Sequence, residues 1–190
     1  MIGYIGIFVA FSFFTFFEPV LADRLQIDFD YDSEEVAYFY SIFTLSGFLS
    51  ALVLALFPLK SNLPYWAGFA YVLGIIALIL MGPNDWIGLP DSTVIIGVGL
   101  FLLSSSTQLL RVASTVMILN ALKSRHPSQI HRISKLLGSL NEIIVSVTFL
   151  VTPLSSSAIY KMLGYKEICN VMAVVSCMGL LLLIVVTMVE

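Results

Sequence analysis

Residues 168–189 read ICNVMAVVSCMGLLLLIVVTMV and contain no Asp, Glu, Lys or Arg. A helix needs about 20 mostly apolar residues to cross the roughly 30 Å hydrocarbon core of a bilayer. Inside that core the backbone finds no water, so only helices and closed barrels satisfy their own hydrogen bonds. We therefore interpret this stretch as a membrane-spanning helix.

Five further apolar stretches of similar length precede it, separated by short segments rich in turn-forming and charged residues. The six predicted spans are Ile2–Ala22, Val36–Leu59, Pro64–Gly82, Ser92–Leu119, Lys135–Ala158 and Ile168–Val189. The short connections leave no room for a soluble domain, so we expect residues 1–190 to form a single all-α transmembrane domain. A signal peptide is the alternative for the first span, because residues 20–22 (VLA) resemble a cleavage site. The lack of an initial basic residue and the interrupting Glu18-Pro19 favour a retained helix.

The composition argues against a soluble globular protein and against a nucleic-acid-binding protein. The chain is 59% hydrophobic and only 11% charged, against about 45–50% and 25% in globular domains. A net charge of −3 argues against a nucleic-acid partner. Cys169 and Cys177 lie eight residues apart in one helix and cannot bridge each other. No cluster indicates a catalytic centre, a metal site or a cofactor, so we do not expect an enzyme.

The basic residues of the connections indicate an orientation. If the spans alternate, five basic residues lie on one side and three on the other. The larger set comprises Lys60, Lys123, Arg125, Arg132 and Lys135, and the smaller comprises Arg24, Lys161 and Lys166. Basic residues favour the cytoplasmic side, so we expect an integral multi-pass protein with both termini in the cytoplasm. The bias does not separate a vesicular from a plasma membrane.

Ionisable side chains inside the spans are candidates for function, because each is costly in lipid unless paired or hydrated. They are Glu18, Arg111 and Glu142. Arg111 and Glu142 both lie roughly 10–13 Å below the cytoplasmic surface on consecutive spans, at about 1.5 Å per residue. Opposite charges at equal depth predict an ion pair between them.

Polar residues at helical spacing extend these two positions into stripes. The stripe of the fourth span comprises Ser104, Gln108, Arg111 and Thr115. The stripe of the fifth span comprises Ser139, Glu142, Ser146 and Pro153. Two polar stripes cannot both face lipid, so they either join helices or line an aqueous path.

The acidic segment before the second span has two interpretations. Asp28, Asp30 and Asp32 alternate as at the start of a calcium-binding loop, but Ser33 and Phe39 occupy the positions of its Gly and Glu. The better interpretation is a helix start, with Asp32 as N-cap and Glu35 completing a capping box.

Three stretches resemble known transporters. Residues 17–22, FEPVLA, are similar to a Leu-Glu-Pro-Thr-Leu motif, residues 139–165 parallel a later helix and its exit, and the stretch before Arg125-His126 resembles a helix with a basic loop. Together they resemble the carboxy-terminal six-helix half of the major facilitator superfamily, most closely its vesicular amine and polyamine branch. On that match Glu142 takes the place of the family's eleventh-helix carboxylate. The resemblance implies two inverted three-helix repeats.

Three departures limit what the resemblance implies. Arg111 occupies the place of a tenth-helix carboxylate, where a cation would repel an amine. Residues 58–63 lack the superfamily's gating motif, and the resemblance begins only at the seventh helix. Six helices supply one wall of a path, so the implied partners are the lipid bilayer and a second six-helix half or a homodimer partner.

The function expected on this basis is membrane transport of a small organic ion, as one half of a secondary transporter that could be proton-coupled. The expected pathway residues are Glu142, Arg111, Glu18, Gln108, Ser104 and Ser146. The alternatives are a non-transporting accessory subunit of a membrane complex and a truncated transporter fragment.

Overall fold

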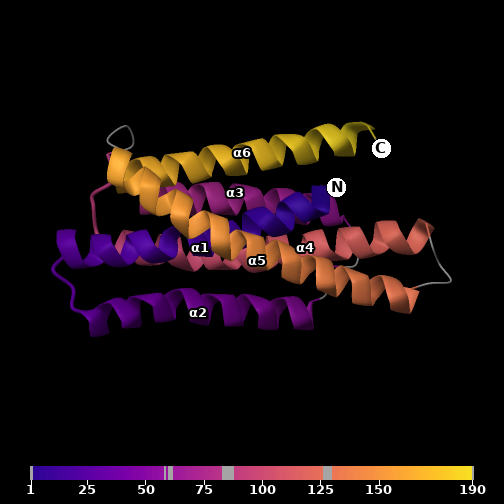
Figure 1. The fold of residues 1–190 in the computed structure, drawn as a ribbon, viewed down its shortest axis with the longest axis horizontal. Coiled ribbons are helices and arrows are strands. Elements are labelled where there is room, and N and C mark those ends of the chain that lie inside the picture. Colours follow the sequence, from indigo (N-terminus) through magenta and orange to yellow (C-terminus); the bar gives the residue numbers. More distant parts are fainter. Residues whose placement is uncertain (1, 58, 60–61, 83–87, 126–129, 190) are drawn as a thin grey trace.

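The structure is a computed structural model that describes residues 2–57, 59, 62–82, 88–125 and 130–189 (Figure 1). All regular secondary structure in these residues is α-helical. The helices are α1 (Ile2–Asp28), α2 (Ser33–Leu56), α3 (Leu63–Met81), α4 (Thr93–Arg125), α5 (Ile130–Leu163) and α6 (Tyr165–Val189). Within these residues, six helices are long and apolar enough to cross a membrane. The expectation of an all-helical, multi-pass membrane protein is confirmed at this level.

Several helices extend beyond their apolar cores. α1 continues to Asp28, six residues past the predicted end, and α4 reaches Arg125 instead of Leu119. Most of the added residues are polar but are compatible with a helix, and hydropathy alone does not detect them. At 33 and 34 residues, α4 and α5 are about 50 Å long, so they exceed the hydrocarbon thickness of roughly 30 Å.

The start of α2 agrees with the predicted capping box. The Asp32 carboxylate accepts a hydrogen bond from the Glu35 backbone N–H at 2.8 Å, and the Asp32 N–H donates to the Glu35 carboxylate at 3.0 Å. Two backbone donors that the first helical turn leaves free are satisfied in this way. α1 runs through Asp28, so Asp28 belongs to a helix and not to a calcium-binding loop.

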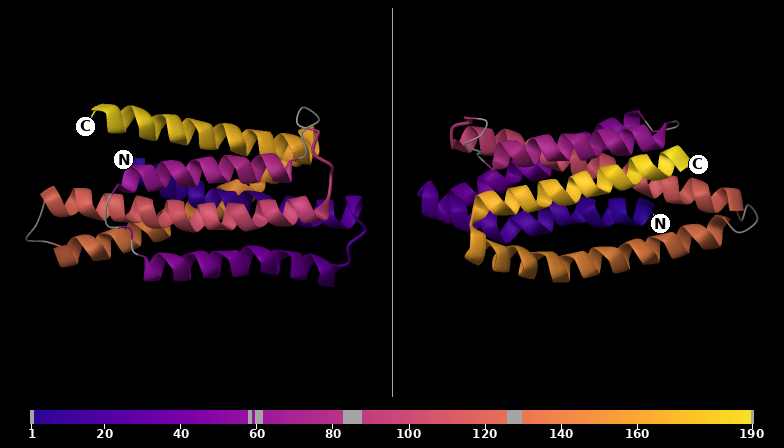
Figure 2. Two further views of the ribbon diagram at one scale, coloured as in Figure 1. Left: turned by 180° about the vertical axis from the view of Figure 1, so that it is seen from behind. Right: turned by 90° about the horizontal axis from the view of Figure 1, so that it is seen from above.

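α1 and α4 pack against each other at the centre of the molecule, and the other helices surround them (Figures 1 and 2). α3 and α6 contact each other and lie on one side of this pair, uppermost in Figure 1. α5 crosses α1 obliquely, and α2 packs against α4 on the side away from α6. The helices alternate in direction, which brings both ends of the chain to the same end of the bundle.

Small and hydroxyl-bearing residues allow the helices to approach closely. A side chain at Gly99 would lie 3.0 Å from the Ala77 carbonyl oxygen, so α3 and α4 are in near-backbone contact there. Between α2 and α4, Ser46 Oγ donates to the Phe101 carbonyl and Ser104 Oγ donates to the Phe43 carbonyl, each at 2.6 Å. Lipid cannot supply such partners, so these hydrogen bonds and close contacts hold the helices together.

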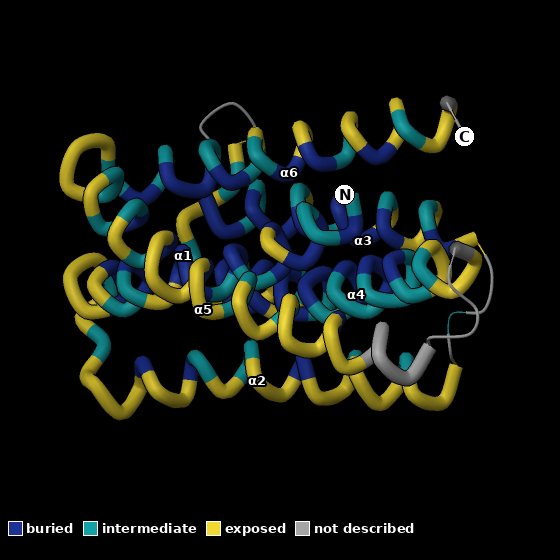
Figure 3. Tube along the Cα trace, turned by 45° about the vertical axis from the view of Figure 1, so that its right-hand side comes forward, coloured by how far each residue is buried: buried dark blue, intermediate teal, exposed yellow. Residues whose placement is uncertain are grey.

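Burial is uneven among the helices (Figure 3). α1, α3 and α4 carry most of the buried side chains, whereas α2 and α5 are exposed over most of their length. The exposed side chains of α2 include Phe48, Leu52 and Leu56, and those of α5 include Ile143, Leu150 and Leu154. Surfaces of this composition suit contact with lipid or with further apolar helices.

The contact at Gly99 makes a testable prediction. In Gly99→Ala the added methyl group meets the Ala77 carbonyl at 3.0 Å and the Met81 N–H at 3.3 Å, and backbone atoms cannot yield without moving α3. We expect the variant to lose about 1–3 kcal/mol of unfolding free energy, measured by denaturation in bicelles. Gly138→Ala is the control, because nothing lies within 4 Å of its added methyl group. Equal stabilities of the two variants would contradict the close α3–α4 packing.

Candidate functional site

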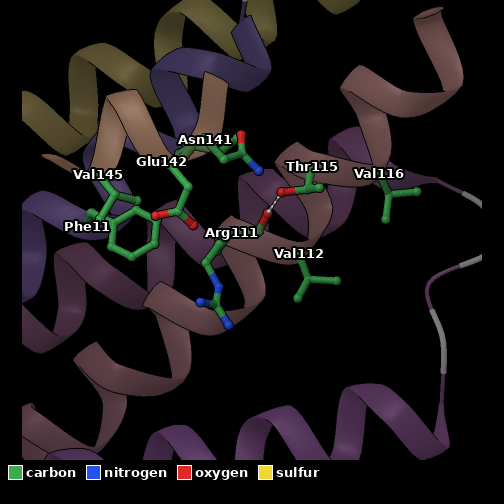
Figure 4. A pocket seen from close by; sticks show the side chains of 9 residues that line it. Phe11, Arg111, Val112, Thr115, Val116, Asn141, Glu142 and Val145 are labelled. Carbon is green, nitrogen blue, oxygen red and sulfur yellow. Dashed lines mark hydrogen bonds between the residues drawn. The ribbon is translucent and has the colours of Figure 1, made fainter. Parts of the chain in front are cut away.

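The two central charged residues line one cavity between α1, α4 and α5. Its volume is about 350 Å³, which is within the range of small-molecule pockets. The lining residues are Ile7 and Phe11 from α1, Arg111, Val112, Thr115 and Val116 from α4, and Asn141, Glu142 and Val145 from α5. Figure 4 shows how the labelled side chains lie around it.

The cavity lies toward the end of the bundle that carries both termini. Its lining comes from the first half of α1, the second half of α4 and the first half of α5. Because these helices alternate in direction, the three segments lie at the same level. The sequence-based expectation that Arg111 and Glu142 share a depth therefore agrees with their common position on the cavity wall.

The predicted ion pair between Arg111 and Glu142 is wrong. Within the described part of the chain, Arg111 and Glu142 form no salt bridge with each other, whereas Arg24 pairs with Asp28 and Asp91. Arg111 instead donates from Nη2 to Gln108 Oε1 at 2.7 Å, and its guanidinium lies 5.8 Å from the centroid of the Phe11 ring. The guanidinium extends away from the Glu142 carboxylate (Figure 4). The physical reason is that α1 packs between α4 and α5, which touch each other only sparsely.

Other polar atoms that line the cavity can also accept hydrogen bonds. Asn141 Oδ1 is buried and has no hydrogen-bond partner. The Thr115 hydroxyl donates to the Arg111 carbonyl at 2.8 Å, which leaves its lone pairs free to accept. The Glu142 carboxylate enters no hydrogen bond or ion pair with a described residue. The wall thus offers a cation, an anion and neutral acceptors around apolar side chains.

The remaining predicted pathway residues lie outside the lining. Gln108 reaches the site through Arg111, whereas Ser104 is buried against α2 and joins two helices. Ser146 donates to the backbone carbonyl of Glu142. Glu18 is exposed on α1, on the same face as Phe11 but two turns further along, and its backbone carbonyl accepts a hydrogen bond from Tyr40. The α4 stripe therefore divides into a helix-joining part and a cavity-lining part.

A buried charge that sequence reasoning missed lies at the opposite end of the bundle. Arg24 was expected in a connection, but it belongs to α1 and is only 3% exposed. Its Nη2 donates to both carboxylate oxygens of Asp91 at 2.6 Å, and its Nη1 donates to the Met81 carbonyl at 3.3 Å. The guanidinium also lies 4.1 Å from the centroid of the Tyr165 ring.

This Arg24 cluster joins three parts of the chain. Met81 ends α3, Asp91 precedes α4 and Tyr165 begins α6, so one guanidinium holds them all against α1. A local signal in the sequence was present, because Arg24 and Asp28 stand at i, i+4 spacing, which favours a continued helix. The two groups are 3.5 Å apart. The partner Asp91 is 67 residues away and no local pattern indicates it.

The chemistry available at the cavity is recognition of charge. Among the described residues, no group of three or more His, Cys, Asp or Glu side chains could hold a metal ion. The cavity can bind an organic molecule against its apolar wall and can compensate charge of either sign on that molecule.

No protein family, no curated protein and no solved structure matches this chain.

The Arg24 cluster makes a second prediction. Asp91→Asn removes the charge that compensates a nearly inaccessible guanidinium, while the Asp91 side chain itself is 48% exposed. The expected loss of unfolding free energy is about 2 kcal/mol, between the values for surface and fully buried ion pairs. Asp23→Asn, at an exposed neighbouring position, is the matched control. Unchanged denaturation of Asp91→Asn in detergent would show that the cluster does not hold the helices.

Proposed function

We propose that this chain forms one half of a secondary transporter of the major facilitator type and moves a small organic ion through the cavity between α1, α4 and α5. The observation that carries the proposal is a cavity among bilayer-length helices that exposes both Arg111 and Glu142. Separated charges are costly in hydrocarbon. They are tolerated where water or a polar solute reaches them, which is the environment of a transport path.

The contacts among the helices support the proposed pair of three-helix repeats. With α1–α3 and α4–α6 as the two sets, α1 packs against α5 and α6, and α4 correspondingly packs against α2 and α3. The pairs α1 with α4 and α3 with α6 join equivalent members of the two sets, whereas the smaller α5–α6 contact has no counterpart of similar extent between α2 and α3. Because each set has three helices of alternating direction, corresponding helices of the two sets run in opposite directions. Transporters built from inverted repeats have this arrangement.

In this proposal a second six-helix body, either another copy or a separate half, completes the path. The support is the exposure of α2 and α5, which flank the central pair (Figure 3). Alternating access in such transporters comes from rocking of two bodies around a site between them. The excess of basic residues near the end that carries the termini favours a cytoplasmic opening.

Glu142 is the proposed proton-responsive group. Its carboxylate has no described hydrogen-bond partner, so protonation breaks no contact within the described part of the chain and instead changes the charge offered to the solute. A change in that charge biases the equilibrium between two arrangements of the helices.

Uptake into proteoliposomes tests the proposed function. Vesicles that contain the purified chain are given a pH gradient and offered a panel of small amines, carboxylates and amino acids. We expect gradient-driven accumulation of at least one compound, and Glu142→Gln is expected to abolish the dependence on the gradient. Glu34→Gln, on the exposed first turn of α2, is the control and keeps it. Absence of any accumulation would refute transport by copies of this chain alone, and full proton coupling in Glu142→Gln would refute the role proposed for Glu142.

A further inference from the structure

We infer that the cavity selects a small zwitterionic solute, a molecule that carries both a cationic amino group and an anionic group on an apolar body. The inference rests on the proposed function and names the substrate class of the same site. The carrying observation is that two opposite charges line one cavity without pairing with each other.

The charged residues that line the cavity determine which charges on a solute are favourable. The described contacts of the Arg111 guanidinium are with neutral groups, namely the Gln108 amide oxygen and the Phe11 ring. The Glu142 carboxylate has no described partner. A solute with one charge compensates one of these groups, displaces water from the cavity and leaves the other group without a charged partner. A zwitterion compensates both and leaves the site neutral.

The Glu142 carboxylate favours placing the amino group on the α5 side. A protonated amine has only donors, so it can bind this carboxylate. The anionic group then faces Arg111, whose guanidinium offers several donors to an oxyanion. Both charged groups of the solute form charge-assisted hydrogen bonds in this orientation.

The rest of the wall is apolar and limits the size of the solute. Phe11 lies on one side of the cavity, and valines from α4 and α5 form much of the remainder. A volume of about 350 Å³ holds a small organic molecule. An inorganic ion would leave the apolar wall without contacts.

Protection of a cysteine from labelling tests the inference directly. Thr115 lines the cavity, so Thr115→Cys is prepared with Cys169 and Cys177 replaced by Ala. The protein in liposomes is treated with a membrane-impermeant methanethiosulfonate. Two zwitterions, leucine and 6-aminohexanoate, bracket the spacing of the charges. Each is compared with its cationic methyl ester and with the anionic acid that lacks the amino group.

We expect at least one zwitterion to slow labelling in a saturable way, at a concentration about tenfold or more below that of its singly charged analogues, as charge-assisted hydrogen bonds predict. Protection by neither zwitterion, or equal protection by an analogue, overturns the inference. If either result occurs and a singly charged ion still shows proton-coupled uptake, the inference fails but the proposed function stands. A Thr115→Cys thiol that is never labelled overturns both.

Substitutions of Arg111 and Glu142 provide a second test of the inference in the same labelling experiment. This test does not depend on the folding of any single variant. Arg111→Gln is expected to shift protection toward the ester, and Glu142→Gln toward the acid, because each leaves a single charge in the wall. Arg111→Lys keeps the charge and the preference for the zwitterion. Lys135→Gln, exposed near the start of α5, is the control. Variants that keep the wild-type order of protection contradict the assigned roles.

Discussion

The interior of a bilayer offers no hydrogen-bond partners, and this constraint governs how the chain treats each charge and hydroxyl group. Arg24 meets it within the protein, because Asp91, the Met81 carbonyl and the Tyr165 ring surround its guanidinium. Arg111 and Glu142 do not meet it in this way, since they face a shared cavity and have no oppositely charged partner among the described residues. The contrast separates a charge that holds helices together from charges that remain available to a solute.

The same constraint explains why hydroxyl groups occur where helices meet. Ser46 and Ser104 bond to backbone carbonyls across the α2–α4 contact, and Ser106 bonds to the Ala70 carbonyl of α3. Thr15 and Thr152 join α1 to α5. These contacts hold α2 and α3 against α4, and α5 against α1. The helices α1, α4 and α5 that they join to their neighbours are the ones that line the cavity.

The sequence predicted the six helices well, because hydropathy over about 20 residues reflects the thickness of lipid. It also predicted the Asp32 cap and the shared depth of Arg111 and Glu142, which follow from local spacing. It failed on the pairing of those two charges, because the position of α1 between α4 and α5 is a tertiary fact that no spacing encodes. Arg24 was missed for a similar reason, since its partner Asp91 is distant in sequence.

Arg111 and Glu142 stand apart in an accessible cavity instead of neutralising each other in a dry interior. A double-mutant cycle measures this most directly, with Arg111→Gln, Glu142→Gln and the double variant unfolded in bicelles without added solute. We expect a coupling energy below about 1 kcal/mol between the two substitutions, as for solvated charges. A coupling of about 1–3 kcal/mol, as found for residues in direct contact, would contradict it.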